Sequence, residues 1–173
     1  MWGSTTAART QLRLNEAQLQ AAITAEQTRV TRAVYADFLR AGVEFELAWR
    51  RLLVGLREGL STAEERDRLY GQVIAREHDR WTSYSILLLE APELVTSLAG
   101  ELTTAYVELD TLGEKTRKHM SAQSWSDFNA AAERCGALTA RFTEGARTIR
   151  ETASTPAVGT VPRRLGTSRW ARR

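Results

Sequence analysis

The first 91 residues of this 173-residue chain contain no proline, and this absence restricts the fold more than any other feature. Proline breaks a helix interior, so a long stretch without it permits long uninterrupted helices. No segment alternates apolar and polar residues over the length that a strand requires. The chain is also long enough to bury a core of its own. We therefore predict a single all-α domain.

The first helix is expected from about residue 5 to residue 58, and its apolar residues follow two patterns. The N-terminal part carries a narrow stripe with spacings of seven, four and seven residues, formed by Leu12, Leu19, Ile23 and Val30. Such a stripe is typical of a coiled-coil helix that pairs with one partner. Beyond it the apolar face broadens, as in helices packed within a core. Residues 1–30 are therefore predicted to project from a bundle formed by residues 31–153.

The second helix is expected to begin at one of two overlapping capping boxes, Ser61 with Glu64 or Thr62 with Glu65. Its predicted core face consists of Tyr70, Val73, Ile74, Trp81, Tyr84 and Leu88. Proline disfavours helix at the residue before it and suits the first helical position, so a third helix should start at Pro92. Pro92 can make either a hairpin or a kink, and a kink would join the second and third helices into one rod.

Two further heptad patterns predict the third and fourth helices. Gly113 is expected to end the third helix or to begin its fraying, and the polar segment 114–123 is expected to form a loop. Ser124 then offers a cap for the fourth helix. Four helices with short connections indicate an antiparallel, up-down-up-down bundle with an extended N-terminal helix.

The last twenty residues, 154–173, differ in composition from the rest and are predicted to be a disordered basic tail. They carry five arginines and no acid, and without these five the chain has 19 basic and 21 acidic residues. The tail is either solubilising or an arm that binds an anionic membrane or nucleic acid. Its candidate contact residues are Arg163, Arg164, Arg169, Trp170, Arg172 and Arg173.

Motifs for catalysis and for metal or phosphate binding are absent from the sequence. The residues three before His78 and His119 are not glutamates, as a di-iron bundle would require. Glu77 is expected to be a boundary residue that pairs with an arginine from a neighbouring helix, and Cys135 a buried inert thiol. No glycine-rich phosphate loop occurs. We predict no enzymatic activity, no cofactor, no metal and no small-molecule substrate.

The location is predicted to be cytoplasmic. No apolar run approaches the roughly 18 residues of a membrane span, and the start does not resemble a signal peptide. The single cysteine also excludes an internal disulfide framework. Association with a membrane surface through the basic tail is the alternative.

The pattern Tyr35-x-x-Phe38-Leu39-x-Ala41, after a helix rich in Gln, Glu and Arg, resembles a loose group of uncharacterised actinobacterial helical proteins. The Ala91-Pro92 junction is similar to theirs, and the likeness covers residues 10–110. Many of these proteins carry a transmembrane anchor before the polar helix, and this sequence departs from them there. The resemblance implies a four-helix-bundle-like architecture and no particular activity or site residues.

The leading functional prediction is a non-enzymatic scaffold that self-associates as a homo-oligomer, or binds a partner helix, through the N-terminal stripe. The first alternative is a cytosolic, membrane-proximal module that touches anionic lipid or a membrane partner. A nucleic-acid-associated regulator is a weaker alternative, because the body is acidic and nucleic-acid footprints normally lie on the folded domain. An enzyme with a pocket at Glu77, Trp81 and Tyr84 is the last alternative.

Overall fold

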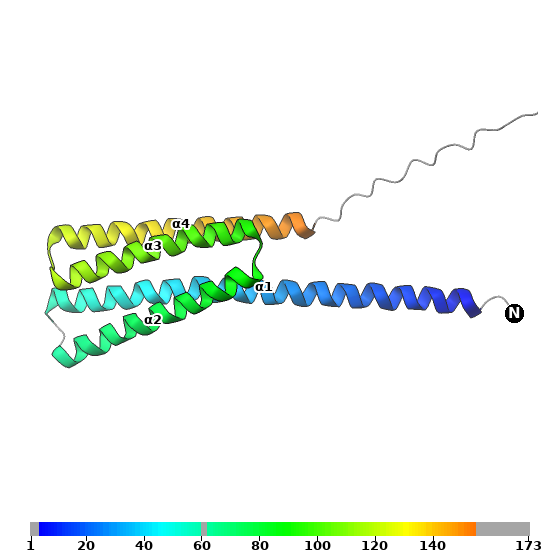
Figure 1. Cartoon of the computed structure of the whole chain (residues 1–173), viewed down its shortest axis with the longest axis horizontal. Helices are drawn as coiled ribbons and strands as arrows, with labels where there is room; N and C mark the ends of the chain where they lie inside the picture. The colour runs from blue at the N-terminus through cyan, green and yellow to red at the C-terminus, as the bar shows by residue number, and fades with distance from the viewer. Residues whose placement is uncertain (1–3, 60–61, 155–173) are drawn as a thin grey trace, which may run out of the picture.

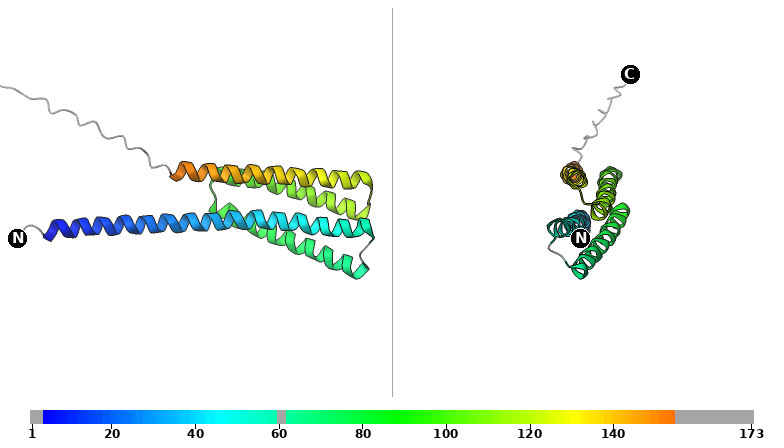
Figure 2. Two further views of the ribbon diagram at one scale, coloured as in Figure 1. Left: turned by 180° about the vertical axis from the view of Figure 1, so that it is seen from behind. Right: turned by 90° about the vertical axis from the view of Figure 1, so that its left-hand side faces the viewer.

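The computed structural model describes residues 4–59 and 62–154, and these residues form four α-helices joined by short turns (Figure 1). The helices are α1 (Ser4–Glu58), α2 (Ala63–Glu90), α3 (Glu93–Lys118) and α4 (Ala122–Ser154). No strand occurs within these two ranges. Consecutive helices run in opposite directions, and α1 extends beyond the other three (Figures 1 and 2). The predicted all-α, antiparallel four-helix bundle with an extended first helix is therefore confirmed.

The bundle consists of two helical hairpins packed together. The most extensive contacts are those of α1 with α2 and of α3 with α4, whereas α2 and α3 touch much less. Pro92 makes a hairpin and not a kink, because α3 runs back in the direction opposite to α2 (Figure 1). The Pro92 carbonyl accepts hydrogen bonds from the backbone N–H of Val95 and Thr96, at 2.9 and 3.0 Å. These bonds begin α3 directly after the proline.

The start of α2 uses Thr62, the cap residue of the second predicted capping box. The Thr62 hydroxyl accepts a hydrogen bond from the backbone N–H of Glu65 at 3.1 Å. Glu64 and Glu65 lie in the first turn, where negative charge interacts favourably with the helix dipole. Side-chain capping and electrostatics therefore favour the same starting residue.

The predicted end of the third helix at Gly113 and the predicted loop 114–123 are wrong. Helix α3 continues to Lys118, α4 begins at Ala122, and only three residues connect them. Gly113 lies inside α3 because the indole of Trp49 packs against it, where a Cβ atom would come within 2.6 Å of the ring. The cap of α4 is Ser121, which exchanges N–H to hydroxyl hydrogen bonds of 3.0 Å with Ser124 in both directions.

The core lies along the middle of the bundle, and aromatic side chains are its largest members. Its largest fully buried apolar side chains are Trp49, Tyr106, Phe38, Phe45, Phe128 and Phe142. The predicted core face of α2 is partly wrong, because Ile74, Trp81 and Leu88 are exposed. The buried line of α2 lies one residue earlier and consists of Val73, Arg80 and Leu87. An arginine therefore occupies a core position that the predicted core face did not include.

Candidate interaction surface

The apolar stripe of α1 is exposed along the part of the helix that projects from the bundle. Every residue from 11 to 27 is exposed, and Figure 1 shows α1 running on alone beyond the ends of its neighbours. The exposed fractions are 62% for Leu12, 61% for Leu19, and 42% for both Ile23 and Val30. The structure places these four predicted residues along one side of the helix, since spacings of seven and four bring side chains to the same face. We call them the N-terminal stripe.

The N-terminal stripe continues the face of α1 that α2 covers within the bundle. Val34 and Ala41 extend the same line of spacing, and they form a groove with Ile86 of α2. Arg76 of α2 pairs with Glu44 of α1 at 3.1 Å. In an antiparallel hairpin, residues that lie level with each other have residue numbers that add up to a constant. The Glu44–Arg76 pair fixes this constant, so Glu90, the last residue of α2, lies level with Val30. The stripe therefore begins where α2 ends.

Polar side chains beside the N-terminal stripe already have partners within α1. Arg29 donates two hydrogen bonds to the carboxylate of Glu26, at 2.9 and 2.7 Å. These bonds lower the pKa of Glu26 and raise that of Arg29. On the opposite side of α1, the hydroxyls of Thr24 and Thr28 donate to backbone carbonyls four residues earlier. Burying the stripe would therefore bring Glu26 to the contact with its ion pair to Arg29 in place.

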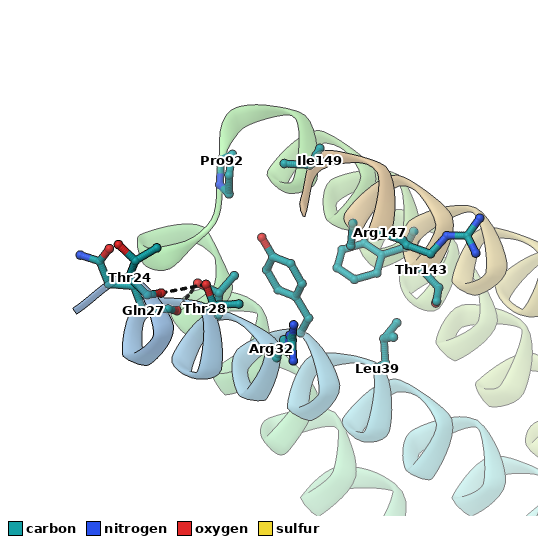
Figure 3. A pocket seen from close by; sticks show the side chains of 13 residues that line it. Thr24, Gln27, Thr28, Arg32, Leu39, Pro92, Thr143, Arg147 and Ile149 are labelled. Atoms are coloured by element: carbon teal, nitrogen blue, oxygen red, sulfur yellow. Dashed lines mark hydrogen bonds between the residues drawn. The ribbon is translucent and has the colours of Figure 1, made fainter. Parts of the chain in front are cut away.

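A second surface feature is a groove between α1 and α4, with a volume of about 460 Å³ (Figure 3). Its apolar floor includes Tyr35, Leu39 and Phe142, and Pro92 closes one end. It lies on the flank of α1 away from the N-terminal stripe. No carboxylate, imidazole or thiol is among the residues that line it. The groove can hold an apolar group, but its lining offers no acid or base near neutral pH. Sequence reasoning missed it, because a groove depends on how two helices align.

Arg80 is the most unusual side chain in the core. It is fully buried, and none of its three guanidinium nitrogens has a hydrogen-bond partner among the described residues. The guanidinium lies over the rings of Trp81, Phe45 and Tyr106, at 4.6, 5.2 and 5.7 Å from their centroids. Burial lowers the pKa of Arg80. Cation–π contacts replace only part of the hydration that the charge has lost.

Two carboxylates act on Arg80 electrostatically without bonding to it. Glu77 is one turn earlier on α2 and half-buried, and Asp110 approaches from α3. Asp110 accepts a hydrogen bond of 3.0 Å from the indole N–H of Trp49. Burial nevertheless raises the pKa of Asp110. The prediction that Glu77 is a boundary residue is confirmed, but the arginine whose charge it feels belongs to its own helix.

The thiol and the imidazoles lie apart from each other and from any cluster of acids. Cys135 is fully buried, and burial raises the pKa of its thiol to about 12. His78 and His119 are both exposed. Within the described ranges, no group of three histidine, cysteine or acidic side chains is placed to hold a metal ion. No helix in that part of the chain is both long and apolar enough to cross a membrane.

Comparison of the chain with protein-family models, with curated proteins and with solved structures gives no match. The resemblance to actinobacterial helical proteins therefore stays a prediction. The candidate anion-binding residues of the tail, Arg163, Arg164, Arg169, Trp170, Arg172 and Arg173, lie outside the described residues. The N-terminal stripe is thus the one predicted contact set that the structure places.

Proposed function

We propose that this chain is a non-enzymatic helical interaction protein that self-associates through the N-terminal stripe of α1. The observation that carries the proposal is the exposure of Leu12, Leu19, Ile23 and Val30 on one face of a projecting helix. An isolated polar helix gains little from apolar residues at heptad spacing, whereas a paired helix buries them in a seam. Exposed apolar side chains gathered on one face are typical of protein–protein contacts.

The length of the projecting segment supports an interface of useful size. Residues 11–30 span about 30 Å of helix at 1.5 Å per residue. This is about three heptads, which is short for a two-stranded coiled coil. We therefore expect a weak, concentration-dependent association and not an obligate oligomer. Such behaviour suits a scaffold whose assembly responds to local concentration.

Sedimentation velocity over a concentration series tests the proposal. The double variant Leu19→Glu/Ile23→Glu places two charges in the stripe and should remain monomeric. The control Ala17→Glu/Ala21→Glu adds the same charge to exposed positions on the opposite face of α1, and it should associate like the parent. Circular dichroism checks that all three proteins have equal helix content.

A parent protein that stays monomeric at every concentration would contradict self-association. The occupant of the stripe would then be a helix of another protein. Equal association of both double variants would show that the chains contact each other through another surface.

A further inference from the structure

The N-terminal stripe has a mirror-symmetric spacing that the proposed self-association does not itself require. Its four members lie seven, four and seven residues apart, so the pattern is the same in either chain direction. Its midpoint is the level of Ala21. Leu19 and Ile23 lie about 3 Å on either side of that level, and Leu12 and Val30 about 13.5 Å on either side. A two-fold axis at this level would relate the stripe to itself.

Two antiparallel copies of α1 therefore match layer for layer. Leu12 of one copy lies level with Val30 of the other, and Leu19 lies level with Ile23. The four apolar layers each set one leucine against one β-branched residue. In heptad terms each layer joins a d position to an a position, which is the pairing that antiparallel coiled coils use. Such an interface uses the same patch on both chains, as expected of a symmetric dimer.

The bundle itself argues against the parallel arrangement. The stripe shares its face of α1 with Val34 and Ala41, and α2 already covers that face from about Val30 onward. A parallel partner would continue along this line, and its own bundle would meet α2. An antiparallel partner instead carries its bundle away past the N-terminal end of this α1. In this arrangement the first turns of each α1 come level with the end of the other chain's α2. Packed helices commonly cross at about 20°, and this angle carries those turns to one side of that α2.

The stripe is interrupted by two charged heptad positions. Glu16 and Glu26 occupy the a and d positions between its apolar members, and Glu16 of one copy falls level with Glu26 of the other when the copies are antiparallel. The two carboxylates then face each other in two further layers of the seam, which opposes association. Glu26 keeps its ion pair with Arg29, which is exposed at the rim. The repulsion in these two layers agrees with the weak association proposed above, and parallel pairing would not avoid it, because it sets Glu16 against Glu16 and Glu26 against Glu26.

We infer that a second copy of this chain covers the N-terminal stripe in antiparallel orientation, with a two-fold axis at the level of Ala21 and the two bundles at opposite ends. The inference rests on the proposed self-association and adds its partner, register and direction. It predicts that each copy covers the segment that α2 leaves bare, residues 11–30.

Disulfide trapping in the full-length chain tests the direction. The single variants Leu12→Cys and Val30→Cys are purified reduced, and oxidised separately and as an equal mixture. In the antiparallel dimer, the mixture brings the new thiol of one variant opposite the new thiol of the other. Two copies of the same variant place their new thiols about 27 Å apart, far beyond the ~7 Å between Cα atoms that a disulfide tolerates. The buried Cys135 serves as the internal control, because the parent should not cross-link.

The expected result is a mixed dimer that joins the two variants through positions 12 and 30. It should be at least about tenfold more abundant than the cross-linked dimer of either variant alone. Efficient cross-linking of Leu12→Cys or Val30→Cys alone would show parallel pairing and overturn the inference, while self-association would stand. Association in sedimentation without either cross-link would place the contact elsewhere and also overturn it. A monomeric parent would contradict the proposed function itself.

Discussion

The indole of Trp49 in α1 fills the space above Gly113 in α3 that any larger residue would need. A Cβ atom at Gly113 would lie 2.6 Å from Cδ2 of the indole, which is closer than van der Waals contact allows. A reciprocal contact places the Tyr106 ring of α3 against Gly42 of α1. The two hairpins are thus joined by one aromatic side chain from each, seated on a glycine of the other.

We expect Gly113→Ala to destabilise the protein although alanine favours helix more than glycine does. The added methyl group overpacks the Trp49 site, which typically lowers the free energy of unfolding by about 1–3 kcal/mol. Urea denaturation measures this change. The matched control is Gly136→Ala, an exposed helical glycine with nothing near its Cβ position. It should be stabilised by about 0.5–1 kcal/mol through helix propensity alone. Stabilisation of both variants would show that Trp49 moves aside without loss.

The features that the sequence predicted well are those that a single helix determines. The end of α1 at Glu58, the cap at Thr62 and the break before Pro92 depend on residues within a few positions of each one. The N-terminal stripe was also predictable, because its spacing is a property of one helix.

The features that the sequence did not predict depend on a neighbouring helix. Gly113 was expected to end its helix because its contact with Trp49, 64 residues earlier, has no local signal. The predicted core face of α2 did not include Arg80, whereas three aromatic rings from α1, α2 and α3 surround it. The groove between α1 and α4 likewise depends on helix alignment. The spacing of apolar residues predicts which face of a helix is buried. The side chains of the neighbouring helix determine which residues can be buried there.

If the membrane-proximal alternative holds, the basic tail should bring the protein to anionic vesicles. Each arginine near such a surface contributes about 1 kcal/mol, so five should produce flotation at low salt. Replacing the arginines of residues 163–173 by glutamine should abolish it, and neutral vesicles are the control. A parent chain that does not float with anionic vesicles would contradict this alternative.

Cys135 should be unreactive in the folded protein. Its thiol is fully buried and its pKa is raised to about 12, so almost no thiolate exists at neutral pH. A chromogenic disulfide reagent should therefore label it only as fast as the bundle opens, and at once in denaturant. Rapid labelling of the native protein would show that the α3–α4 interface opens locally.

Replacing Arg80 with methionine should stabilise the bundle. The guanidinium is buried without a hydrogen-bond partner in the described part of the chain, so its desolvation is poorly offset. An apolar side chain of similar length keeps the contacts with Phe45 and Tyr106, and we expect the free energy of unfolding to rise by about 1–3 kcal/mol. The control is Arg134→Met, which removes an exposed ion pair with Glu108 and should change stability by less than about 1 kcal/mol. A large loss in Arg80→Met would indicate that the arginine is bonded to buried water or to a carboxylate.

Asp110 should make the stability of the protein depend on pH, in the sense opposite to an ordinary paired carboxylate. Burial raises the pKa of Asp110 above its ordinary value of 3.8. The folded protein therefore binds this proton more readily than the unfolded chain does. Its contribution to stability is fully present below pH 3.8 and is lost as the pH rises through the raised pKa.

Asp110→Asn keeps an oxygen that can accept the hydrogen bond from the Trp49 indole N–H, but its side chain never ionises. The variant should thus be more stable than the parent at neutral pH, and the difference should shrink as the pH falls. Urea denaturation between about pH 3 and pH 7 measures the difference, with Glu133→Gln as the baseline for losing one exposed charge. A variant less stable than the parent at neutral pH would show that the attraction of Arg80 outweighs the burial of the carboxylate.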